Sequence, residues 1–250
     1  MKTDYYEDYW NAQANREAGW SPSQGWVTPD ERKLFAQWIK PGWTCVDYGC
    51  GDGQRYGIKL KESGVDYRGF DISACALGQA GSQGLVVEPL TADGATSMPD
   101  SSADATICFE VMEHMLEPQR AVRELKRCLK SGGHAIFSVP NAGFWTARME
   151  FLLTGFFCPG GSPQTARTSP WCDPHIRFFT PSILRTLMQS EGLTVVQEIG
   201  EDFSLSMMPV LWRLKRVKAF LNTLSKPIGF LGKLFPSLLS GRLFIVVRKA

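Results

Sequence analysis

The chain has 250 residues, of which 44% are hydrophobic and 21% are charged. This composition is ordinary for a globular protein and excludes a disordered, collagen-like or coiled-coil chain. At this length we expect one large domain, or one domain with an appendage, and a sizeable buried core. The net charge of +2 is unevenly spread: residues 1–202 carry 18 bases and all 25 acids, whereas residues 203–250 carry nine bases and no acid.

The start of the chain and its cysteines favour the cytoplasm. The first ten residues include three acids and no apolar stretch, so we expect no signal peptide. No run of about 18 apolar residues occurs, so we expect no membrane-spanning helix. The seven cysteines form no C-x-x-C pair, and Cys45 and Cys108 fall in apolar runs where cysteine acts as a small hydrophobe. A reducing cytoplasm therefore fits best.

Residues 28–140 alternate short β-rich runs with helix-like stretches, the pattern of a doubly wound parallel sheet with helices on both faces. Thr28, Pro29 and Glu31 predict the capped start of a helix. Pro118 opens a later helix, which we expect Gly132-Gly133 to stop. The expected strands are 44–48, 67–72, 85–88, 105–110 and 135–139, and further helices are expected at 54–62 and from Ser73.

Residues 141–250 have a less regular pattern. We expect an amphipathic helix at 144–153, a lid or binding segment at 159–174, a helix at 181–190 capped by Thr180, and strands at 193–199 and 243–247. Residues 203–240 hold short amphipathic helical pieces. The chain thus divides into an aromatic front segment (1–27), an α/β core (28–202), a basic helical insertion (203–240) and a final core strand (241–250).

A glycine-rich run, VDYGCGDG (46–53), lies where the first strand turns into a helix, the place where doubly wound sheets bind nucleotides. Gly49, Gly51 and Gly53 permit a tight turn and close approach of a ligand, although the same run also fits a plain glycine turn. Asp52 stands near the helix N-terminus, where a dinucleotide's pyrophosphate would be held. Its carboxylate disfavours NAD and FAD.

Further carboxylates end the neighbouring strands. Asp71 suits the two hydroxyls of a ribose, Asp93 an adenine amine, and Asp47 an ammonium group reached through water. Together they predict a phosphate-free nucleoside with a positively charged amino acid end, which is S-adenosylmethionine. The expected cofactor contacts also include Ile72, Gly94, Phe109 and Glu110.

At residues 28–200 the chain resembles the class I S-adenosylmethionine-dependent methyltransferases. The matching motifs are VDYGCGDG (46–53), GFDIS (69–73), TADGATSMP (91–99), DATICFEVMEHMLEP (104–118) and LKSGGHAIFSVPN (129–141). The resemblance implies a Rossmann-like seven-stranded sheet whose last strand is antiparallel. The alternative is a Rossmann-like domain without catalysis, because a fold alone does not establish function.

The run EVMEH (110–114) places two carboxylates near an imidazole. If it forms a helical turn, Glu110, Glu113 and His114 share one face and can hold Mg²⁺ or Mn²⁺. The run is similar to the metal-binding motif of ubiquinone-biosynthesis O-methyltransferases and of small-RNA 2′-O-methyltransferases, and by the latter similarity His175 is a fourth ligand. The alternative is a structural Glu113–His114 pair with Glu110 facing the cofactor.

The histidines favour methylation of a hydroxyl. A hydroxyl acceptor must lose a proton, and His114 or His175 can serve as the general base, with Glu110 and Glu113 positioning the acceptor. We expect His134, which falls inside a strand, to be structural.

The two ends of the chain suggest partners. In similar methyltransferases an aromatic front segment covers the cofactor and acceptor, so Tyr9 and Trp10 are candidate lid residues. The alternative is an aromatic arm packed on the sheet or on a neighbouring subunit. The basic, aromatic stretch 203–240 fits either peripheral contact with an anionic membrane or a cap on the acceptor pocket. Nucleic acid is the weakest candidate, because the core is acidic.

We therefore expect an enzyme that O-methylates a small or amphiphilic acceptor, such as a quinone precursor or a sugar, including a lipid-linked one. One rival is an accessory protein, since residues 30–190 also resemble methionine-biosynthesis protein W in the run SVPNAGFW (138–145). The other is an RNA 2′-O-methyltransferase. The sequence leaves the acceptor and the oligomeric state open.

Overall fold

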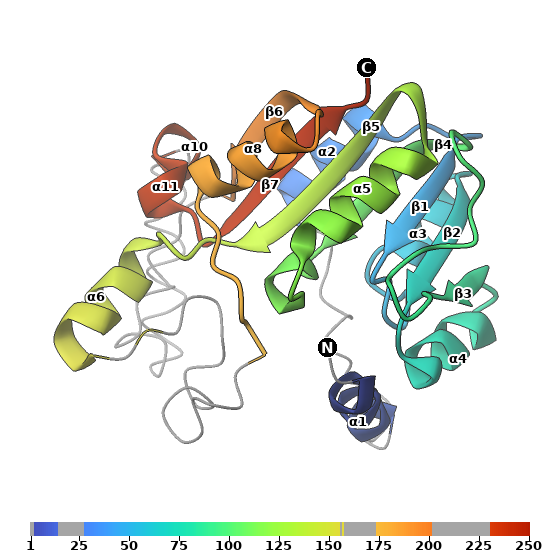
Figure 1. The fold of residues 1–250 in the computed structure, drawn as a ribbon, viewed down its shortest axis with the longest axis horizontal. Helices are drawn as coiled ribbons and strands as arrows, with labels where there is room; N and C mark the ends of the chain where they lie inside the picture. The colour runs from blue at the N-terminus through green and yellow to red at the C-terminus, as the bar shows by residue number, and fades with distance from the viewer. Residues whose placement is uncertain (1–2, 15–27, 156, 158–173, 202–230) are drawn as a thin grey trace.

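A computed structural model describes residues 3–14, 28–155, 157, 174–201 and 231–250. Its centre is a seven-stranded sheet in the order β3-β2-β1-β4-β5-β7-β6, in which β7 runs antiparallel to both of its neighbours (Figure 1). This confirms the expected Rossmann-like fold. The strands are β1 (Thr44–Tyr48), β2 (Asp66–Asp71), β3 (Val87–Pro89), β4 (Ala103–Phe109), β5 (Leu129–Pro140), β6 (Thr194–Gly200) and β7 (Arg242–Arg248).

The central strands are buried on both faces, which explains their nearly continuous apolar runs. Successive residues of β7 alternate between two cores: Phe244 and Val246 pack on one side, and Ile245 and Val247 on the other. The first core is completed by α2 (Pro29–Trp38) and α3 (Gly57–Glu62), and the second by α5 (Pro118–Cys128) and α8 (Pro181–Ser190). The helices thus cover both faces of the sheet, as the alternating pattern predicted.

The sequence signals for helix starts are confirmed. The Thr28 side chain accepts a hydrogen bond from the Glu31 N–H, and the Glu31 carboxylate accepts one from the Thr28 N–H, so the predicted capping box forms. Thr180 caps α8, and Ser73 caps α4 (Ala74–Ser82). The start of α3 differs from the prediction by three residues, because this helix begins at Gly57 rather than Gln54.

The expectation that Gly132-Gly133 stops α5 is wrong. The helix ends at Cys128, and both glycines lie inside the 12-residue strand β5. A β-carbon on Gly133 would lie 3.0 Å from the Asp104 carbonyl oxygen, beside a shift in register between β4 and β5. The glycine therefore permits a close approach of two strands.

The two end segments differ from the core. The aromatic front segment contains a helix, α1 (Thr3–Ala14), which we did not predict from the sequence. Of the basic insertion, only α10 (Leu231–Leu234) and α11 (Pro236–Leu239) fall among the described residues. The expected lid or binding segment 159–174 also lies outside them, apart from Pro174.

The helix expected at 144–153 is α6 (Trp145–Thr154), and Ala147 is its one buried residue. Within the described parts of the chain, no helix has the length and apolar character needed to cross a membrane.

Candidate active site

A cavity of about 520 Å³ opens at the carboxyl ends of β1, β2 and β4. It lies where the strand order reverses between β1 and β4, the usual ligand site of such sheets. Its walls come from α1, from the segments that follow β1, β2, β3 and β4, and from the stretch around residue 175. The described lining residues are Tyr5, Tyr6, Tyr9, Trp10, Tyr48, Gly49, Gly51, Asp71, Ile72, Leu90, Glu110, Val111, His114, Met115, Pro174 and His175.

The glycine turn forms the floor of the cavity. Gly49 and Gly51 have φ angles of +79° and +56°, which L side chains rarely adopt. A β-carbon on Gly51 would lie 2.6 Å from the Trp10 ring. Gly53 also has positive φ but faces Leu85, outside the cavity lining, so its role is in packing.

Asp71 lies at the end of β2 with its carboxylate held by the backbone. Its two oxygens accept hydrogen bonds from the Gly51 N–H (2.8 Å) and the Ser73 N–H (3.0 Å). Burial raises the pKa of Asp71. Asp71 and Ile72 both line the cavity, so they stand where the sequence predicted the ribose contacts.

Asp47 and Asp52 lie behind the floor of the cavity and do not line it. Asp47 accepts a hydrogen bond from the Tyr67 hydroxyl (2.7 Å), and burial raises its pKa to about 7. Asp52 accepts one from the Gln54 N–H. The prediction that Asp52 directly repels a phosphate is therefore wrong, because its carboxylate is buried beneath the turn.

The residues expected to contact the adenine do not line the cavity either. Asp93 is exposed and accepts a hydrogen bond from the Thr91 hydroxyl, and Phe109 packs between Tyr56 and Phe244 in the core. The Gly94 carbonyl accepts a hydrogen bond from the Tyr48 hydroxyl (3.0 Å), which ties the loop after β3 to the end of β1.

Sequence reasoning missed Tyr48 and Leu90, which line the cavity here. Tyr48 lies between Asp47 and Gly49 of the motif, and this position could have predicted that it lines the cavity.

Glu110 does not share a helical face with Glu113 and His114. It has a φ of +56°, and the turn that follows it, η2 (Met112–His114), is a short 3₁₀ helix that begins two residues later. The Glu110 carboxylate accepts a hydrogen bond from the Ser138 hydroxyl (2.7 Å). Glu110 therefore lines the cavity apart from the other members of the expected metal site.

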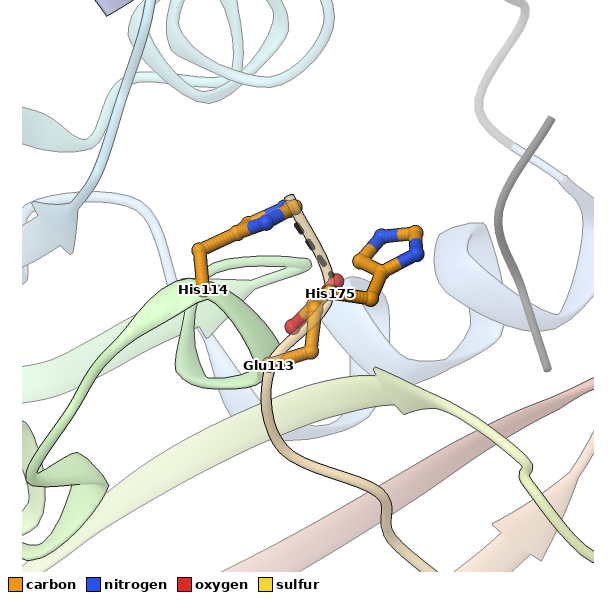
Figure 2. A group of neighbouring side chains, drawn as sticks. All are labelled: Glu113, His114 and His175. Atoms are coloured by element: carbon orange, nitrogen blue, oxygen red, sulfur yellow. Dashed lines mark ion pairs between the residues drawn. The ribbon is translucent and has the colours of Figure 1, made fainter. Parts of the chain in front are cut away.

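Glu113, His114 and His175 form a compact cluster (Figure 2). Their potential ligand atoms lie within 4.8 Å of one another, and the two imidazole rings stack with centroids 4.7 Å apart. The Glu113 carbonyl accepts hydrogen bonds from the Ile176 and Arg177 N–H groups, which hold His175 against η2.

The Glu113 carboxylate is buried. Among the described residues neither of its oxygens has a hydrogen-bond partner, and one of them lies 3.8 Å from His114 Nε2, with which it forms an ion pair when that ring is protonated. Burial and the nearby Glu110 raise its pKa well above the usual range.

The His114 ring has a defined tautomer. Its Nδ1 lies 3.1 Å from the Pro174 carbonyl oxygen, and a carbonyl only accepts, so Nδ1 carries the hydrogen. In the neutral ring Nε2 is then the basic nitrogen, on the Glu113 side. His134 lies elsewhere, half-buried against the Trp38 ring, and does not line the cavity.

The helix α1 covers the cavity with four aromatic residues, Tyr5, Tyr6, Tyr9 and Trp10. The Tyr6 ring meets His114 edge-on at 5.8 Å, and Trp10 packs on Gly51. Burial, the largest cause, raises the pKa of Tyr6, so its hydroxyl stays protonated at neutral pH. The two predicted lid residues are therefore half of a larger aromatic cover.

Comparisons with known proteins agree with this geometry. Residues 14–198 match a family model described as a methyltransferase domain. The chain is 30% identical over 179 residues to a ubiquinone biosynthesis O-methyltransferase of Paraburkholderia phymatum, covering 64% of this chain and 72% of that protein. It is 29% identical over 202 residues to the enzyme of the same name from Ralstonia nicotianae, covering 74% and 79%.

Solved structures share the fold at lower identity. A SAM-dependent methyltransferase from Archaeoglobus fulgidus superposes with a TM-score of 0.59 at 16% identity, covering 88% of this chain and 92% of that one. Phosphoethanolamine N-methyltransferase 2 of Haemonchus contortus, solved with S-adenosyl-L-methionine, gives a TM-score of 0.60 at 15% identity and covers 99% and 58%.

Proposed function

Because the chain belongs to the methyltransferase domain family and is an S-adenosylmethionine-dependent methyltransferase, we propose that it methylates a hydroxyl group of a small or amphiphilic acceptor. The observation that carries this proposal is the basic Nε2 of His114, whose ring lines the cavity and is oriented by the bond from Nδ1 to the Pro174 carbonyl. Methylation of oxygen needs such a base, because the hydroxyl proton must leave.

The reaction is an in-line displacement. The acceptor oxygen forms a bond to the methyl carbon as the carbon–sulfur bond breaks, and its electron pair returns to sulfur to give S-adenosylhomocysteine. The hydroxyl proton passes to His114 Nε2, where the Glu113 carboxyl group 3.8 Å away stabilises the imidazolium when it is ionised. The aromatic cover of α1 contributes by aligning the acceptor and excluding water.

The lining favours an acceptor without a phosphate at its reacting end. Among the described residues that line the cavity none is lysine or arginine, whereas Asp71 and Glu110 are acids. The tyrosine rings of α1 suit a flat ring such as a phenol, or a sugar face. The relatives named as ubiquinone biosynthesis O-methyltransferases support a quinone precursor, and the acidic lining argues against RNA.

The test follows the release of S-adenosylhomocysteine from wild-type protein given a catechol, a simple sugar, an amine or a short RNA. We expect turnover with the catechol or the sugar and none with the amine or the RNA. Turnover with the amine alone would contradict O-methylation. Cofactor binding without turnover on any acceptor, together with a co-purifying enzyme, would favour the accessory role suggested by methionine-biosynthesis protein W.

As an alternative to proton transfer to His114, we propose that Glu113, His114 and His175 hold a divalent cation such as Mg²⁺ or Mn²⁺, in which case His114 Nε2 is a ligand and not the base. The donor set fits, because a buried carboxylate without a hydrogen-bond partner among the described residues lies beside two imidazoles, one with its other nitrogen bonded to a carbonyl. Such a cation would lower the pKa of an acceptor hydroxyl.

Calorimetry with Mn²⁺ tests this cation site. We expect binding to the wild type that Glu113→Gln weakens at least tenfold. The matched variant Glu117→Gln, at an exposed carboxylate, should bind as the wild type does. No binding, together with full turnover in EDTA, would contradict the site.

We further propose that the protein contacts a membrane surface. The segment 203–240, to which we assigned this contact, lies mostly outside the described residues, but α6 supports it. Phe151, Leu152 and Leu153 are 52%, 73% and 75% exposed, and Phe157 stacks edge-on against Phe151. An exposed apolar surface of this kind fits an interfacial contact that gives access to a lipid-linked acceptor.

Co-sedimentation with phosphatidylglycerol vesicles tests it. Serine at all three α6 positions should reduce binding at least fivefold, whereas the double variant Ile183→Ser/Val196→Ser, at exposed apolar positions on α8 and β6, should not. Equal binding by all three proteins would contradict a contact through α6.

A further inference from the structure

The helix α1 meets the cofactor side of the cavity and the acceptor side at once. Trp10 packs on Gly51 of the glycine turn, and one helical turn earlier Tyr6 meets the ring of His114. The two residues are four apart and therefore lie on one face of the helix. The position of α1 thus sets both walls of the cavity together.

One side chain of α1 is bonded outside the cavity. The Glu7 carboxylate accepts a hydrogen bond from the Ser73 hydroxyl (2.7 Å) through one oxygen and from the Cys75 N–H (3.0 Å) through the other. Cys75 lies in the first turn of α4, where backbone N–H groups lack partners within the helix and the helix dipole favours a negative charge. Both oxygens of Glu7 are thus engaged by the start of α4.

Further hydrogen bonds connect Ser73, the partner of Glu7, to the predicted ribose site. The Ser73 N–H donates to one oxygen of Asp71, and the other oxygen of Asp71 accepts the Gly51 N–H. A continuous series of hydrogen bonds therefore runs from Glu7 through Ser73 and Asp71 to Gly51, on which Trp10 rests. Fixing Glu7 on α4 fixes the aromatic cover against the glycine turn.

We propose that Glu7 is a positioning residue that latches α1 onto the start of α4 and so encloses the bound cofactor. This inference rests on the proposed assignment of the cavity to S-adenosylmethionine, and it is independent of the acceptor. Lifting of α1 opens the cofactor side of the cavity, so the latch slows the release of the cofactor and its product. Its loss raises the dissociation rate and leaves the core of the sheet intact.

The test is the dissociation rate of S-adenosylhomocysteine from the full-length protein, measured by stopped-flow displacement. We expect Glu7→Ala to raise the rate at least tenfold. Asp8→Ala removes the same charge from an exposed position on the same helix and should change the rate less than twofold. Glu7→Gln, whose amide oxygen still accepts one hydrogen bond, should give an intermediate rate.

A double variant separates the latch from a general loss of stability. Ser73→Ala removes one partner of Glu7, so in that background Glu7→Ala should raise the rate less than half as much as it does alone. The unfolding midpoint of the apoprotein should stay within about 2 °C of the wild type in Glu7→Ala.

Two results would overturn the latch: an unchanged dissociation rate in Glu7→Ala and Glu7→Gln, or equal increases in Glu7→Ala and Asp8→Ala. No acceptor is present, so a failure of the O-methylation proposal leaves this test unaffected. Absence of S-adenosylhomocysteine binding to the wild type would instead reject the cofactor assignment itself.

Discussion

The two walls of the cavity are built differently. The cofactor wall consists of turns that directly follow β1 and β2, and its main carboxylate, Asp71, is fixed by two backbone N–H groups. The acceptor wall joins η2, the stretch around His175 and α1, which are far apart in sequence and are held by a few hydrogen bonds and ring contacts. Strand ends therefore fix the cofactor, whereas the acceptor wall depends on contacts between distant segments.

The largest expected effect is on the cofactor wall. Asp71→Ala should weaken S-adenosylmethionine binding at least about 100-fold, because it removes the predicted ribose contact and leaves the Gly51 and Ser73 N–H groups without their acceptor. Titration calorimetry measures the change. Asp66→Ala, at the exposed start of the same strand, is the control and should bind normally. Similar affinities for both variants would place the ribose elsewhere.

Behind the same wall, Asp47 should make stability depend on pH. Its folded-state pKa of about 7 exceeds an unfolded value near 4, so the folded state holds the proton and loses stability as the pH rises toward 7. Asp47→Asn removes this loss. In urea unfolding of the apoprotein, the variant should gain about 2–3 kcal/mol relative to the wild type between pH 5 and pH 8. A difference that does not change with pH would contradict the raised pKa.

The contact between the walls can be tested at glycines with similar backbone strain. Gly51→Ala and Gly42→Ala both place a side chain at positive φ, but only the first meets the Trp10 ring, since the space around Gly42 is open. We expect Gly51→Ala to weaken cofactor binding about tenfold more than Gly42→Ala does. Equal affinities would show that Trp10 does not rest on this turn when the cofactor is bound.

The smallest effect concerns the loop after β3. Tyr48→Phe removes the hydrogen bond to the Gly94 carbonyl and should weaken cofactor binding about three- to fivefold, the value of one hydrogen bond of about 1 kcal/mol. Tyr67→Phe also removes a hydroxyl of the core, but one that faces Asp47, and it serves as the comparison. A loss of 100-fold in Tyr48→Phe would mean that this hydroxyl contacts the ligand directly.

The same difference between the walls explains what the sequence could predict. Strand patterns and cap residues such as Thr28 and Thr180 are local signals, and they located the sheet, the glycine turn and Asp71 correctly. The positive φ of Glu110, which separates it from Glu113, depends on the packing of β4 against β5 and leaves no mark in residue spacing.

Contacts over long sequence distances account for the remaining differences. The family resemblance suggested His175, and the hydrogen bonds from residues 176 and 177 to the Glu113 carbonyl and from His114 to the Pro174 carbonyl bring it to His114. The helix α1 is an exception, because its cavity-lining aromatic residues recur four positions apart (Tyr5 and Tyr9, Tyr6 and Trp10), a spacing that is typical of one helix face and could have predicted it.

The central claim is that one wall binds the cofactor while His114 serves the acceptor, and the variant His114→Ala tests it most directly. S-adenosylhomocysteine affinity and methyl transfer to the best acceptor are measured on the same preparation. The account predicts an affinity within about twofold of the wild type and turnover reduced at least 100-fold, the lower range for loss of a general base. Normal turnover, or a parallel loss of binding and turnover, would contradict the account.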